Sequence, residues 1–211
     1  MYKCNLLEGN ISFNDIFKSI DEVFTLNNKG LFIMELPSEF FCDLNFSTVK
    51  HLIDNGFNGV YVSFQRPIEN ICSCFKELDI DIDKIHFLDG TKKIKGEKKK
   101  DILPKDVEKI FDSIYSSLKS LKGVNKFVII DSLTTMALIN TESWSESFSD
   151  YLVRTKEDDD FKNIIFLVNV AKELSEKSIV KEVCNYADGI LNIDSSSKGY
   201  SVELIKPNIL A

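Results

Sequence analysis

The feature that most constrains the fold is a set of short apolar runs in which polar residues do not alternate. Two of these runs, residues 127–130 and 164–168, are apolar at every position. Continuous apolar strands are typical of sheets whose two faces are both covered by helices. Because longer stretches of helical period separate the runs, the sequence predicts an α/β protein with a mainly parallel central sheet.

Seven strands are expected, with the last two forming an antiparallel hairpin at one edge of the sheet. The predicted strands are residues 31–35, 59–64, 84–88, 126–131, 163–169, 189–193 and 201–205. The predicted helices are residues 14–26, 44–55, 67–78, 104–121, 143–154 and 173–186. No internal repeat or boundary is visible, so we expect one domain over residues 1–211. It would have a helical segment at 1–28, a core at 29–193, and an edge strand and tail at 194–211.

Composition excludes several classes of protein. The 211 residues are 44% hydrophobic, which excludes intrinsic disorder and a disulfide mini-scaffold. With 33 acidic and 26 basic residues the net charge is −7, so we do not expect nucleic-acid binding. We see no run of signal-peptide or membrane-spanning length, and therefore expect a cytoplasmic protein with no membrane contact. The five scattered cysteines are expected to be reduced.

One strand-end motif carries a candidate chemistry. The apolar run at 127–130 ends in Asp131, followed by Ser132 and Thr134. A strand-end carboxylate of this kind is typical of the Walker B element, which holds Mg²⁺ next to bound phosphates. An aspartate that caps the following turn is at least as common, so this motif alone leaves both readings open.

The order of elements and motifs resembles the RecA superfamily, and within it the archaeal and bacterial KaiC-like ATPases. The resemblance rests on Gly59-Val-Tyr-Val-Ser-Phe64, on Phe87-Leu-Asp89 and on the Asp131-Ser-Leu-Thr134 strand end, and it covers residues 28–193. It implies a three-layer RecA-like (P-loop NTPase-like) fold, with Asp131 as the metal ligand if a nucleotide with Mg²⁺ binds. It also implies side-by-side packing of subunits, so we expect a protein partner or a second copy of this chain.

The sequence departs from the family at the phosphate-binding loop, which requires G-x-x-x-x-G-K-[ST]. The corresponding segment, residues 36–46, contains neither glycine nor lysine. Glu39 and Asp43 would place negative charge where phosphates would lie, and Phe40 and Phe41 would fill the space. The sequence therefore predicts a degenerate P-loop.

A second departure concerns the residue that activates water. KaiC-like ATPases carry a pair of glutamates after the second strand, and here those positions are Gln65 and Arg66. Glutamine orients water but is a poor proton acceptor. The resemblance therefore implies a pseudo-ATPase without catalytic residues and without a cofactor. The sequence is similar to P-loop-less KaiC-like domains associated with sensory proteins. We therefore expect the protein to act as a regulatory or scaffold partner, or as a ligand sensor.

Ligands of open α/β sheets bind at the carboxyl ends of the strands. The candidate ligand-binding residues are therefore Ser38, Gln65, Arg66, Asp89, Asp131, Ser132 and Thr134. Each could instead be structural, and Arg66 and Asp131 could form an ion pair. The ligand would be a small molecule or a partner protein.

Two alternatives remain open. The chain could bind ATP, or hydrolyse it weakly, through an unorthodox cradle in which Asp131 binds Mg²⁺ and a lysine from residues 92–100 reaches the phosphates. Without a functional role, that lysine-rich stretch would be a solvated loop. The chain could also be a different α/β enzyme whose element order is coincidental. A RecA-type sheet places the strand at 31–35 centrally and the strand at 126–131 nearby, away from the edge.

Overall fold

The predicted strands form one seven-stranded sheet in the computed structural model, which describes residues 17–18, 21, 28–91, 104–139, 145–174, 178–196 and 199–205. The order across the sheet is β3-β2-β4-β5-β1-β6-β7. The strands are β1 (Lys29–Leu36), β2 (Asn58–Ser63), β3 (Ile85–Asp89), β4 (Asn125–Asp131), β5 (Asn163–Ala171), β6 (Gly189–Ser196) and β7 (Gly199–Ile205).

The pairing directions confirm the predicted mainly parallel sheet with an antiparallel edge. Every pair from β3 across to β6 is parallel, and only β7 runs antiparallel, to β6. β1 lies inside the sheet between β5 and β6, and β4 lies between β2 and β5. This is the strand placement expected of a RecA-like domain, and it argues against a coincidental element order.

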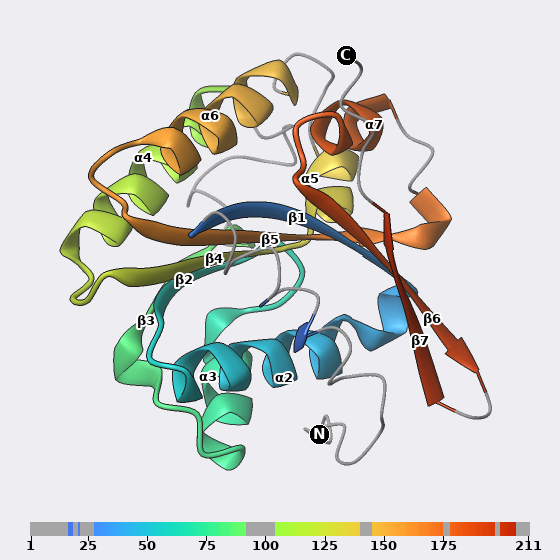
Figure 1. The fold of residues 1–211 in the computed structure, drawn as a ribbon, viewed down its shortest axis with the longest axis horizontal. Helices are drawn as coiled ribbons and strands as arrows, with labels where there is room; N and C mark the ends of the chain where they lie inside the picture. Colours follow the sequence, from blue (N-terminus) through green and yellow to red (C-terminus); the bar gives the residue numbers. More distant parts are fainter. Residues whose placement is uncertain are drawn as a thin grey trace.

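Helices cover both faces of the sheet (Figure 1). One face carries α2 (Phe41–Asp54) and α3 (Ile68–Glu77), and the other carries α4, α5, α6 and α7. The bounds of the second group are α4 (Pro104–Ser120), α5 (Leu133–Ile139), α6 (Ser145–Glu157) and α7 (Ser178–Cys184). Each face has its own buried apolar cluster, so the central strands are covered on both sides, as their apolar runs predict.

One helix prediction differs from the structure, one helix was not predicted, and one prediction lies mostly outside the described residues. The helix expected at 173–186 begins only at Ser178, and Lys172–Leu174 form a separate 3₁₀ turn, η4. The seven-residue helix α5 was not predicted, because its short apolar run continues directly from a strand end. The helix expected at 14–26 lies mostly outside the described residues, of which Phe17, Lys18 and Asp21 are helical.

The cysteines differ from the expectation at one position. Cys42, Cys72 and Cys184 are free, but Cys74 is disulfide-bonded. The prediction that all five cysteines are reduced is therefore wrong at Cys74, since spacing along the sequence does not show which thiols lie together in space. Within the described part of the chain, no helix combines the length and the apolar character that crossing a membrane requires.

Candidate functional site

A group of buried polar side chains lies at and below the carboxyl ends of β2, β4 and β5. We call Asn45, Tyr61, Asp131 and Asn169 the Asp131 cluster. The Tyr61 hydroxyl donates to Asp131 Oδ2 at 2.8 Å. Asn45 Nδ2 donates to the Tyr61 hydroxyl oxygen at 3.1 Å, and Asn169 Nδ2 donates to Asn45 Oδ1 at 2.7 Å. All four residues are at most 1% exposed, so these hydrogen bonds form away from water.

Strand register and one helix bring the Asp131 cluster together. Ile130 of β4 is paired with Val168 of β5, so the next residues, Asp131 and Asn169, are neighbours at the strand ends. Asn45 comes from α2 and bonds to both Tyr61 and Asn169, so this helix is attached to two strands by one amide. The cluster therefore fixes the start of α2 relative to the end of β4.

The electrostatic balance around Asp131 is set by burial and by one arginine. Burial raises the pKa of Asp131, while the Arg66 guanidinium and the hydrogen bond from Tyr61 lower it. Burial likewise raises the pKa of Asp43 and Cys42, and Arg66 opposes it in both cases. Arg66 therefore lowers the pKa of each of these three groups, and no ion pair between Arg66 and Asp131 is found among the residues that the structure describes.

The backbone of Arg66 is held by the end of β2. Ser63 Oγ donates to the Arg66 carbonyl oxygen at 2.8 Å and accepts from the Arg66 N–H at 3.1 Å. Ser63 is completely buried, so this turn has a fixed anchor. The position of Arg66 is therefore part of the fold, although its side chain is half-buried.

Hydroxyl groups form a second polar group beside the Asp131 cluster, at the start of α5. Gln65 Nε2 donates to Ser132 Oγ at 2.9 Å and to Thr135 Oγ1 at 3.1 Å. Ser132 Oγ also lies 3.0 Å from Thr134 Oγ1, which accepts from the Ala171 N–H at 3.3 Å. These contacts join the loop after β2 to the start of α5 and to the end of β5.

The segment at the position of a phosphate loop has a different shape. β1 ends at Leu36, residues Ser38–Phe40 form the 3₁₀ turn η1, and α2 begins directly at Phe41. Phe41 is 0% exposed and belongs to the apolar cluster beneath α2 and α3. Glu39 is exposed on the turn, and Asp43 lies in the first turn of α2. The chain thus enters the helix through a tight turn that carries Glu39, and Asp43 follows in the first turn of the helix.

Four of the sequence-derived candidates come together: Gln65, Asp131, Ser132 and Thr134, with Arg66 beside them. The other two lie apart. The Asp89 carboxylate ends the edge strand β3 and accepts from the N–H and hydroxyl of Thr91 at 2.9 and 2.6 Å. Ser38 is exposed after β1, which β5 separates from β4.

Sequence reasoning missed Asn45, Tyr61 and Asn169. A signal did exist for Asn169, which interrupts the apolar run of β5 at the position next to the end of β4. The lysine-rich stretch at 92–100, invoked in the ATP-binding alternative, lies outside the described residues.

A magnesium ion at this edge would meet Asp131, a fully buried carboxylate. Asp131 is fully buried and one of its oxygens accepts from Tyr61, while the described residues contain no group of three or more His, Cys, Asp or Glu side chains placed to hold a metal. Magnesium requires several oxygen ligands and usually keeps some of its water. Binding at Asp131 would therefore require the cluster to open.

Comparison with known protein families shows the family to which this chain belongs. The model described as "ATPase: KaiC" matches residues 47–205, about three-quarters of the chain. This chain belongs to the KaiC ATPase family. The matched region of this family member begins inside α2, after the turn at the phosphate-loop position.

Several solved structures of archaeal proteins share the fold. One is the uncharacterized protein PH0321 from Pyrococcus horikoshii, crystallised in complex with an unknown peptide: 12% identity, TM-score 0.63, covering 94% of this chain and 91% of that one. The flagellar accessory protein FlaH from Methanocaldococcus jannaschii has 14% identity and a TM-score of 0.61, covering 87% and 80%. The KaiC-like protein PH0186 from Pyrococcus horikoshii OT3 has 16% identity and a TM-score of 0.56, covering 85% and 80%. No curated protein matches the chain.

Proposed function

We propose that this KaiC-family protein does not hydrolyse ATP, and that it acts as a regulatory or scaffold partner or as a ligand sensor. The observation that carries the proposal is the turn between β1 and α2. A phosphate loop binds through backbone N–H groups that glycines allow to curl around the anion, together with a lysine. Here the turn is three residues long, Phe41 fills the core behind it, and Glu39 and Asp43 are acidic.

The state of Gln65 supports the absence of hydrolysis. Its amide nitrogen is engaged with the hydroxyl groups of Ser132 and Thr135. A glutamine amide has no basic site at neutral pH, so it cannot remove a proton from an attacking water. Gln65 therefore links the loop after β2 to the start of α5.

The same geometry supports binding without turnover. Three half-buried side chains at the carboxyl ends of the strands come from different parts of the fold. Arg66 is held by Ser63 at the end of β2, Gln65 contacts α5, and Asp43 belongs to α2. A small molecule or partner protein that binds there would therefore favour one arrangement of α2 and α5 over another. The unknown peptide bound to PH0321 supports a peptide or protein partner.

The proposal is tested by thermal unfolding with and without millimolar ATP, ADP and Mg²⁺. A ligand at about 100 times its dissociation constant stabilises the native state by about 2.7 kcal/mol, which would shift the midpoint clearly. We expect no shift. A Mg²⁺-dependent shift that Asp131→Ala abolishes, and that the exposed control Asp150→Ala keeps, would instead establish ATP binding through an unorthodox cradle.

A further inference from the structure

The two outermost strands of the sheet, β3 and β7, differ in length and in exposure. β3 has five residues, all of them buried or half-buried. β7 has seven residues, and all of them pair with β6 in one continuous register without a bulge. Glu203 and Ile205 of β7 are exposed, and Ile205 is one of the few large apolar residues that are more than 40% exposed. Among the described strands only β6 pairs with β7, so β7 has an outer side that a further strand can reach (Figure 1).

The strand register shows which backbone groups of β7 point away from β6. Ser196 and Gly199 close a two-residue connection, so they form a hydrogen-bonded pair of the antiparallel ladder. Hydrogen-bonded and non-hydrogen-bonded pairs alternate along such a ladder. The N–H and C=O groups of Tyr200, Val202 and Leu204 therefore point to the outer side of β7.

Part of the β6–β7 hairpin extends beyond the neighbouring strand. β1 pairs with β6 only from Gly189 to Asn192, whereas β7 pairs with β6 as far as Ser196. Residues 193–196 and 199–202 therefore form a two-stranded ribbon, and two strands alone are marginally stable in water. A further strand on the outer side of β7 would stabilise this ribbon.

We propose that the outer side of β7 pairs antiparallel with β7 of a second copy of this chain, about a two-fold axis at Val202. In this register Tyr200 lies opposite Leu204 of the second copy, so all three outward-pointing residues both donate and accept. Glu203, the only charged residue of β7, lies opposite Ser201. An axis at Glu203 would instead place two carboxylates opposite each other, which is destabilising. The sequence of β7 is thus complementary to itself in one register, whatever the carboxyl ends of the strands bind.

The test is sedimentation velocity of the full chain over a wide range of protein concentrations. We expect a monomer–dimer equilibrium in which the dimer increases with concentration. Val202→Pro removes an N–H that points away from β6, a position where an edge strand tolerates proline, so it should abolish the dimer and leave the hairpin paired. Val124→Ser changes an exposed apolar residue far from β7 in the sequence, and this control should dimerise like the wild type.

A charge exchange tests the register and does not depend on how the proline variant folds. Ser201→Glu places a carboxylate opposite Glu203 of the second copy, twice by symmetry. It should raise the dissociation constant of the dimer by about two- to thirtyfold. Adding Glu203→Lys to that variant makes both facing pairs opposite in charge, and should restore at least the wild-type affinity. A charge exchange that changes nothing would overturn the proposed register.

Hydrogen exchange gives a second readout, because the dimer alone protects the outward-pointing amides. Protection of the Val202 amide should rise with protein concentration, whereas the Glu203 amide, which faces β6, should be protected at every concentration. A protein that stays monomeric, or a dimer that Val202→Pro leaves intact, would overturn the proposal. Protection of Val202 in the monomer would also overturn it, because another segment of the same chain would then cover the outer side of β7.

Discussion

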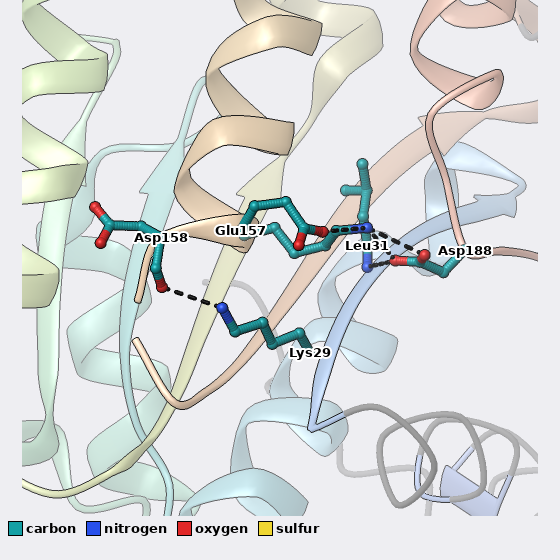
Figure 2. A network of polar contacts seen from close by, with 6 residues as sticks. Lys29, Leu31, Glu157, Asp158 and Asp188 are labelled. Carbon is teal, nitrogen blue, oxygen red and sulfur yellow. Dashed lines mark hydrogen bonds and ion pairs between the residues drawn. The ribbon is translucent and has the colours of Figure 1, made fainter. Parts of the chain in front are cut away.

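Two aspartates at opposite ends of the parallel strands have contrasting environments; we call the two ends the amino edge and the carboxyl edge of the sheet. Asp188, at the amino edge, accepts from the Leu31 N–H at 2.7 Å and from Lys156 Nζ at 3.0 Å. Figure 2 shows this network together with Lys29, which donates to the Asp158 carbonyl oxygen. Asp131, at the carboxyl edge, is completely buried and has a phenol for a partner where Asp188 has an ammonium group.

The difference shows which edge is arranged for stability. A buried carboxylate is favourable when a cation and N–H donors compensate its lost hydration, and costly otherwise. At Asp188 these partners join the end of α6 to β1 and to the start of β6. At Asp131 the printed hydrogen-bond partner is the uncharged Tyr61 hydroxyl, and the carboxylate is completely buried. The amino ends of the strands thus carry a direct ion pair, whereas the carboxyl ends carry a buried polar cluster around Asp131.

The largest expected effect tests the apolar part of the carboxyl edge. Phe41→Ala removes a fully buried ring from the cluster beneath α2, and should lower the free energy of unfolding by about 3 to 5 kcal/mol. Phe40→Ala, on the half-buried neighbour, should cost clearly less. Chemical denaturation of both variants measures the difference, and equal losses would mean that Phe41 does not anchor the turn.

The second prediction concerns the loss of the Asp188 charge at the amino edge. Asp188→Asn leaves Lys156, whose side chain is 12% exposed, without its main anionic partner, and should destabilise the fold by about 2 to 3 kcal/mol. The matched control is Asp150→Asn, in an exposed pair with Arg154, which should change stability by less than about 1 kcal/mol. If the two variants unfold at the same denaturant concentration, the Asp188 network is not a stabilising clamp.

The third prediction is that the same change at Asp131 has a small effect that depends on pH. Asparagine keeps an acceptor for Tyr61 and removes a buried charge, so Asp131→Asn should lie within about 1 kcal/mol of the wild type near pH 5. Burial raises the pKa of Asp131 in the folded state, so the wild type loses stability as pH rises through that value. The variant lacks this loss, which begins at the ordinary aspartate pKa of 3.8, and should therefore gain relative to the wild type between about pH 4 and pH 8. A relative loss over that interval would contradict the assignment.

The smallest expected effect concerns Gln65. Gln65→Glu introduces the acidic residue expected at this position from the family resemblance, and under the proposed function the edge does not hold a nucleotide. We expect no phosphate release from ATP above that of the wild type in a steady-state assay. Measurable hydrolysis by the variant, removed again by adding Asp131→Ala, would show that the edge still holds a nucleotide.

Much of the fold follows from the sequence, and the interior of the site does not. The central strands were predictable because their short apolar runs are typical of a sheet that helices cover on both faces. The role of Asn45 was not, because its contacts to Tyr61 and Asn169 depend on how α2 lies across three strands. Asp131, Ser132 and Gln65 were found from their place at strand ends, whereas Asp89 and Ser38 lie apart because the strand order separates them.

The most direct test of the central claim is a calorimetric titration of the purified protein with ATP in the presence of Mg²⁺. Our account predicts no saturable binding at millimolar nucleotide, for the wild type and for Asp131→Ala alike. Saturable binding by the wild type that disappears in Asp131→Ala would contradict it, and would show that the turn between β1 and α2 does not exclude the nucleotide.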